Sequence, residues 1–105
     1  MTFFKNIIHE KNIDVKTDIS LIKKGISVYG LYLICVDSKN PVLMQILSCK
    51  QALKKISDTD GLVVIGMAKT SSSARELVKR IIENYLVRHT DLNGFKAFYT
   101  GQNNG

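Results

Sequence analysis

The chain has 105 residues, of which 45% are hydrophobic and 23% are charged. This length is close to that of a typical single domain, and this composition excludes an intrinsically disordered chain. We therefore predict one α+β domain over residues 1–100 and a disordered tail over residues 101–105. No apolar run approaches the ~18 residues of a membrane span, and the first residues do not resemble a secretory signal. These features predict a cytoplasmic protein that does not contact a membrane.

The formal net charge of +6 is the feature of the composition that suggests a partner. A basic surface attracts nucleic acid and other polyanions. The lysines and arginines are spread along the chain without a basic block, so nucleic-acid binding is one hypothesis among several.

The N-terminal segment has apolar residues at steps of three and four, namely Phe3, Phe4, Ile7 and Ile8. This spacing predicts a short amphipathic helix over residues 2–11, which Thr2 could cap.

Residues 12–25 carry two conflicting patterns. Ile13 and Val15 alternate as in a strand, whereas Ile19 and Ile22 could form a helical turn that ends at Gly25. We favour a short strand over residues 13–16.

Two apolar segments follow, separated by a turn at residues 37–41. Ile26–Val36 is rich in β-branched residues and predicts a long strand, with a bulge or close backbone approach at Gly30. Residues 41–47 suit either a second strand or a helix that begins at Pro41. We favour the strand, so that the two segments form a hairpin.

The next segments predict a helix, a strand and a longer helix. Ser48 is suited to cap a short helix over Cys49–Ser57. Leu62–Ala68 is apolar at nearly every position, as expected of a central strand buried on both faces. From Ala74 to His89 the apolar residues repeat at helical spacing along one stripe.

The C-terminal segment predicts a last short strand over Phe95–Tyr99, after a turn at residues 90–94. A crossover from Leu62–Ala68 through the long helix to this strand would be parallel and right-handed. We expect the aromatic residues to belong to the core, including Tyr29, Tyr32 and Phe98.

These elements predict an α+β fold with a mixed sheet of four to five strands, in the approximate order α-(β)-β-β-α-β-α-β. The helices are expected to cover mainly one face. The other face would then be left to solvent, to the N-terminal segment or to a second subunit.

The junction between the central strand and the long helix is the best candidate for an anion site. A helix N-terminus presents free N–H groups and the positive end of the helix dipole. The candidate residues there are Lys69, Thr70, Ser71, Ser72, Ser73 and Arg75. The simpler interpretation is that Thr70 or Ser71 caps the helix, and neither a P-loop nor a Gly-x-Gly-x-x-Gly motif is present.

Other catalytic chemistry finds little support in the sequence. A serine nucleophile at residues 71–73 would need a base, and His89 lies ~27 Å away at the other end of the helix. Cys35 and Cys49 do not form a Cys-x-x-Cys motif, and core packing explains both. We therefore expect no metal, no cofactor and, on balance, no enzyme activity.

For nucleic acid, the candidate cations lie on the two predicted helices between residues 49 and 89. They would form one basic strip if both helices covered the same face of the sheet. The candidates are Lys50, Lys54, Lys55, Lys79, Arg80 and Arg88, together with Arg75.

The leading functional hypothesis is a noncatalytic binding or regulatory module that acts through protein association, as a homodimer or with another protein. The uncovered sheet face or the Phe3–Phe4 helix would form the interface. The alternatives are a basic protein associated with nucleic acid, and a phosphate- or nucleotide-binding protein that uses Lys69–Ser73.

Overall fold

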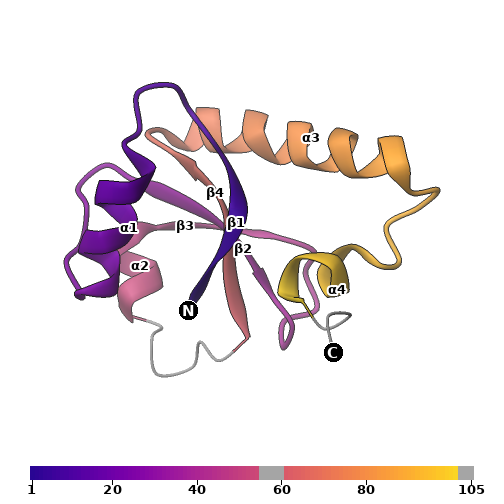
Figure 1. Cartoon of the computed structure of the whole chain (residues 1–105), viewed down its shortest axis with the longest axis horizontal. Helices are drawn as coiled ribbons and strands as arrows, with labels where there is room; N and C mark the ends of the chain where they lie inside the picture. Colours follow the sequence, from indigo (N-terminus) through magenta and orange to yellow (C-terminus); the bar gives the residue numbers. More distant parts are fainter. Residues whose placement is uncertain (55–60, 102–105) are drawn as a thin grey trace.

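A mixed β-sheet lies between helices in the structure, a computed structural model that describes residues 1–54 and 61–101 (Figure 1). The described segments form these elements, in chain order: β1 (Thr2–His9), α1 (Val15–Lys23), β2 (Tyr32–Asp37), β3 (Gln45–Ser48), α2 (Cys49–Lys54), β4 (Leu62–Ala68), α3 (Ser71–Arg88) and α4 (Phe95–Thr100). The predicted α+β class with one mixed sheet is confirmed. The rest of the predicted helix over Cys49–Ser57 and nearly all of the predicted tail lie outside the described residues.

The sheet has the strand order β1-β4-β2-β3. β1 is parallel to β4, whereas β2 is antiparallel to both β4 and β3. All seven residues of β4 are buried, and its place between β1 and β2 confirms the predicted central strand. The predicted hairpin is confirmed by the pairing of β2 with β3.

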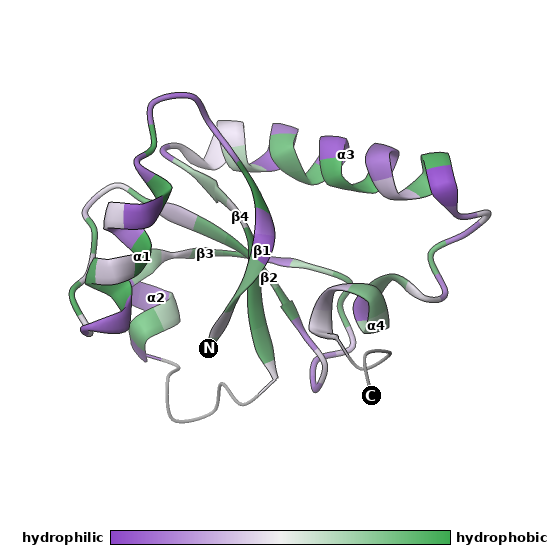
Figure 2. Ribbon diagram, in the orientation of Figure 1, coloured by the Kyte–Doolittle hydropathy of each residue, from purple (hydrophilic) through white to green (hydrophobic). Residues whose placement is uncertain are grey.

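Helices cover both faces of this sheet. Alternate residues of β4 point to opposite faces, so that Val64 belongs to the core beneath α1 and α2, and Ile65 to the core beneath α3 and α4. In Figure 2 the hydrophobic residues of the helices form stripes, whereas those of β2 and β4 are continuous. The expectation that helices cover mainly one face was therefore wrong, because β4 is apolar on both sides and needs two covering layers.

The N-terminal segment is a strand, not the predicted helix over residues 2–11. Phe3 and Ile7 contact the core beneath α1 and α2, whereas Phe4 and Ile8 contact the opposite core. The register with β4 shifts between Phe3 and Ile8, so β1 is irregular. Two adjacent apolar pairs separated by two polar residues fit a helix stripe and also a strand buried on both faces.

Residues 15–23 form α1, where the sequence favoured a short strand over residues 13–16. Asp14 caps this helix, because its carboxylate accepts hydrogen bonds from the Thr17 N–H at 3.2 Å and the Thr17 hydroxyl at 2.9 Å. These hydrogen bonds hold the pKa of Asp14 below its ordinary value. The Asp14-x-x-Thr17 cap was the signal for a helix that the alternation of Ile13 and Val15 concealed.

Two further elements differ from the prediction. The strand expected over Ile26–Val36 begins only at Tyr32, and residues 26–31 form a loop. Phe95–Thr100 is helix α4, so there is no parallel crossover to a final strand. Phe95 and Tyr99 are four residues apart, which places both against the core from one side of a helix.

A side chain at Gly66 should destabilise the protein, because β1, β2 and β4 approach closely around this residue. A Cβ atom at this position would lie 2.8 Å from Ile34 Cδ1 and 3.3 Å from the Ile8 carbonyl oxygen. Gly66→Ala should therefore lower the free energy of unfolding by about 1–3 kcal/mol, measured by urea denaturation. Ile34→Val removes the nearest atom, so Gly66→Ala should cost less in that background. Equal costs in both backgrounds would show that this contact is not the cause.

Candidate functional site

The start of β2 is the point at which the ends of two other strands meet. Tyr32 is paired with Ser48, the last residue of β3, and with Ala68, the last residue of β4. Each strand passes directly into a helix, α2 after β3 and α3 after β4, and these helices cover opposite faces of the sheet. Helices that diverge to opposite faces leave a crevice at the strand ends, which is a recurrent position for ligand sites in α/β sheets.

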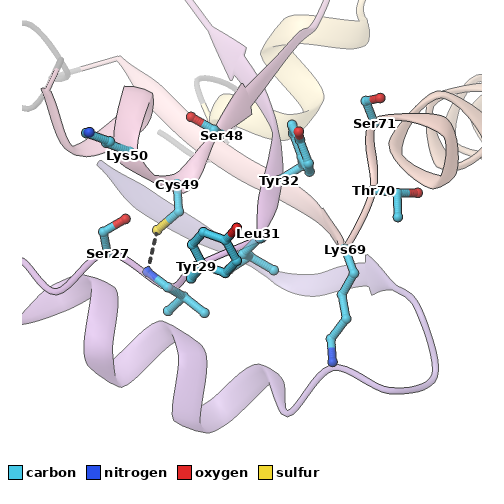
Figure 3. Close-up of a pocket in the computed structure, with 12 residues that line it drawn as sticks. Ser27, Tyr29, Leu31, Tyr32, Ser48, Cys49, Lys50, Lys69, Thr70 and Ser71 are labelled. Atoms are coloured by element: carbon cyan, nitrogen blue, oxygen red, sulfur yellow. Dashed lines mark hydrogen bonds between the residues drawn. The ribbon is translucent and has the colours of Figure 1, made fainter.

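A pocket of about 480 Å³ occupies this edge of the sheet (Figure 3). Three segments line it: the loop and first strand residue at 27–32, the β3–α2 junction at 48–50, and the β4–α3 junction at 69–71. Segments that are far apart in the sequence therefore form one concave surface.

The β4–α3 junction is held by a cap. The Thr70 hydroxyl oxygen accepts a hydrogen bond from the Ser73 N–H at 3.0 Å and donates one to the Ser73 hydroxyl at 2.9 Å. The Lys69 N–H donates to Glu10 Oε1 at 2.6 Å, which ties the end of β1 to the junction. Within residues 1–54 and 61–101, the N–H groups of Ser71 and Ser72 have no protein acceptor. The predicted capping role of Thr70 is confirmed.

The β3–α2 junction has a capping box. The Ser48 hydroxyl accepts from the Gln51 N–H at 3.1 Å, and Gln51 Oε1 accepts from the Ser48 N–H at 2.9 Å. The Cys49 N–H donates to the Leu31 carbonyl oxygen at 2.9 Å. These bonds confirm Ser48 as the predicted cap. They also fix the start of α2, which carries Lys50.

The loop over residues 26–31 forms the remaining wall. The Val28 N–H donates to Cys49 Sγ at 3.3 Å, and the Leu31 N–H donates to the Val28 carbonyl oxygen at the same distance. Gly30 has a φ of 76°, a left-handed conformation that glycine adopts without strain. The side chain of Tyr29, at the tip of this turn, is fully exposed, so the prediction that it belongs to the core was wrong.

The residues that line the pocket include two lysines. Lys50 and Lys69 are both exposed and come from the two junctions, and the lining residues include no aspartate or glutamate. The lining also includes no histidine, so the groups that most often transfer protons near neutral pH are not part of the wall. Hydroxyl and ammonium groups are suited to hold an anionic molecule.

The structure divides the predicted anion-site residues. Lys69, Thr70 and Ser71 line the pocket, whereas Ser72, Ser73 and Arg75 do not. The strand pattern of Ile26–Val36 concealed the loop residues and Tyr32 as parts of the site. The positive φ of Gly25 and Gly30 belongs to a loop, and these two glycines were the signal for one.

The predicted nucleic-acid residues do not form one strip. Lys50 and Lys54 lie on α2, whereas Lys79, Arg80 and Arg88 lie on α3, which covers the opposite face. Lys55 lies outside the described residues. Lys50 alone among these candidates lines the pocket with Lys69.

Across the described parts of the chain, no helix is long and apolar enough to cross a membrane. Those same parts contain no group of three His, Cys, Asp or Glu residues placed to hold a metal ion.

Comparison with protein-family models, with curated proteins and with solved structures finds no significant match to this chain.

The helix cap at Thr70 should contribute to the stability of the protein. Thr70→Ala removes the acceptor for the Ser73 N–H and should lower the free energy of unfolding by about 1 kcal/mol, measured by urea denaturation. Thr70→Ser keeps the hydroxyl and should retain most of the stability. An equal loss in both variants would indicate that the methyl group, and not the cap, stabilises the junction.

Proposed function

We propose that the protein is a noncatalytic binding module that takes up a small phosphate-bearing molecule in the pocket between the β3–α2 and β4–α3 junctions. The observation that carries the proposal is the presence of Lys50 and Lys69 in one pocket whose lining residues include no carboxylate. Two cations in the lining of one pocket attract an anionic ligand.

The size and chemistry of the pocket support this proposal. Its volume falls in the range of roughly 300–1,000 Å³ that is usual for small-molecule sites. The hydroxyls of Ser27 and Ser71 add hydrogen-bonding groups to the lysines. Phosphate oxygens accept hydrogen bonds from all of these donors.

The proposed location of this binding module is the cytoplasm. Cys49 is a buried thiol, and reduced thiols are usual in that compartment. The Cys49 sulfur accepts a hydrogen bond from the Val28 N–H, so the thiol serves to position the loop that lines the pocket.

Binding of pyrophosphate, followed by titration calorimetry and by thermal shift, tests the proposed function. The wild-type protein should bind it and melt at a higher temperature in its presence. Lys50→Gln and Lys69→Gln should each weaken binding by about tenfold, since each removes a hydrogen bond to a charged group.

Lys54→Gln is the matched control, because Lys54 is an exposed lysine of the same helix as Lys50 but does not line the pocket. It should leave the affinity within about twofold, since a charge outside the pocket is screened by salt. Equal weakening by all three substitutions would indicate general charge attraction, and no binding by the wild type at low salt would overturn the proposed function.

Protein association is the second candidate function, and we propose a homodimer that forms through an apolar groove where α3 ends beside α4. The predicted interfaces, an uncovered sheet face and a Phe3–Phe4 helix, are not present. Helices cover both sheet faces, and Phe3 and Phe4 lie in β1. Val87 is 81% exposed and Phe98 is 45% exposed. Both line one groove of about 380 Å³, and exposed apolar surface of this kind favours an interface.

Light scattering with size-exclusion chromatography tests the homodimer. The wild-type protein should elute as a dimer at high micromolar concentration. Val87→Lys should shift it to monomer, because burial of an unpaired charge at an interface is unfavourable. Glu83→Lys, also exposed on α3 but outside the groove, should leave the dimer intact. A monomeric wild type would contradict this candidate.

A further inference from the structure

The most unusual side chain at the pocket is Tyr29. Its relative exposure is 102%, whereas Tyr85 and Phe95 are buried against each other with ring centroids 5.1 Å apart. Within the described residues, the Tyr29 side chain forms no hydrogen bond, ring contact or cation–π contact. Core packing therefore does not explain an aromatic residue at this position.

The backbone around Tyr29 is well anchored in spite of the exposed side chain. Val28 and Leu31, on either side of the turn, are both hydrogen-bonded to Cys49 at the start of α2. The Leu31 N–H also closes the turn on the Val28 carbonyl oxygen. The ring thus projects from a constrained turn into the mouth of the pocket.

The ring lies beside the proposed anion site. Tyr29 lines the same pocket as Lys50 and Lys69. In the view of Figure 3, its ring lies between the Cys49 and Lys69 side chains. A ligand that stacks on the Tyr29 ring lies in the same pocket as the two lysines. The pocket is also lined by Tyr32, a second aromatic residue.

We infer that the ligand is a nucleoside phosphate, whose phosphate contacts the lysines and whose base stacks on Tyr29. This inference rests on the proposed function and adds the class of ligand to it. A sugar phosphate would use the lysines alone and would leave the Tyr29 ring in water. A base has a flat π-face, and stacking on an exposed aromatic residue stabilises any of the common bases.

Titration calorimetry of the full chain with three probes tests the inference: AMP, ribose 5-phosphate and adenosine. AMP should bind about tenfold more tightly than ribose 5-phosphate, the equivalent of ~1.4 kcal/mol. Adenosine should bind more weakly than AMP, because it lacks the anion.

Two substitutions of Tyr29 isolate the contribution of the ring. Tyr29→Ala should bring AMP to the affinity of ribose 5-phosphate and leave the affinity of ribose 5-phosphate itself unchanged. Tyr29→Phe keeps the aromatic face and should keep the preference for AMP. Phe98→Ala is the control, since this exposed ring lies on α4 and outside the pocket, and it should change neither affinity. The exposed side chain of Tyr29 predicts unchanged melting temperatures for its variants.

The outcomes separate the inference from the proposed function. Equal binding of AMP and ribose 5-phosphate by the wild type would overturn the nucleoside phosphate and leave the anion pocket standing. A preference for AMP that survives Tyr29→Ala would also overturn the inference, because the base would then contact another surface. No binding of either phosphate, or of pyrophosphate, would overturn both.

Discussion

The burial of β4 on both faces is the constraint on which the rest of the structure depends. A strand that is apolar on both sides needs a covering layer on each face, and all seven of its residues are buried here. The chain supplies these layers with α1 and α2 on one side and α3 and α4 on the other. β1 and β2 both lie close to this strand at Gly66, because a Cβ atom there would meet Ile34 and the Ile8 carbonyl oxygen.

The pocket is a consequence of these two layers. The helices that follow β3 and β4 must leave the same edge of the sheet toward opposite faces, and they separate beside Tyr32, which pairs with the ends of both strands. The crevice between them brings together Lys50 and Lys69, two lysines that the sequence analysis assigned to different hypotheses. This pocket therefore contains one residue from each hypothesis.

The incorrect predictions share a physical cause. Apolar residues at Phe3, Phe4, Ile7 and Ile8 fit a helix stripe, yet they also alternate correctly for a strand buried on both faces. The aromatic residues between Phe95 and Tyr99 fit a strand and, at a spacing of four, a helix. In such short segments the hydrophobic period is ambiguous. The N-terminal segment is a strand because its backbone pairs with β4. Similarly, the expectation that Tyr29 belongs to the core followed from the usual burial of aromatic residues, although the adjacent Gly30 belongs to a loop.

The sequence by itself determined the elements with an unambiguous local signal: the buried β4, the amphipathic stripe of α3, the β2–β3 hairpin and the caps at Ser48 and Thr70. It also suggested a candidate site at Lys69–Ser73 with Arg75, because a strand that leads into a helix exposes free N–H groups. Of these residues, Lys69, Thr70 and Ser71 line the pocket. Only the tertiary structure decided which faces the helices cover and which residues meet at the sheet edge. These features depend on contacts between segments such as residues 27–32, 48–50 and 69–71, which no local pattern encodes.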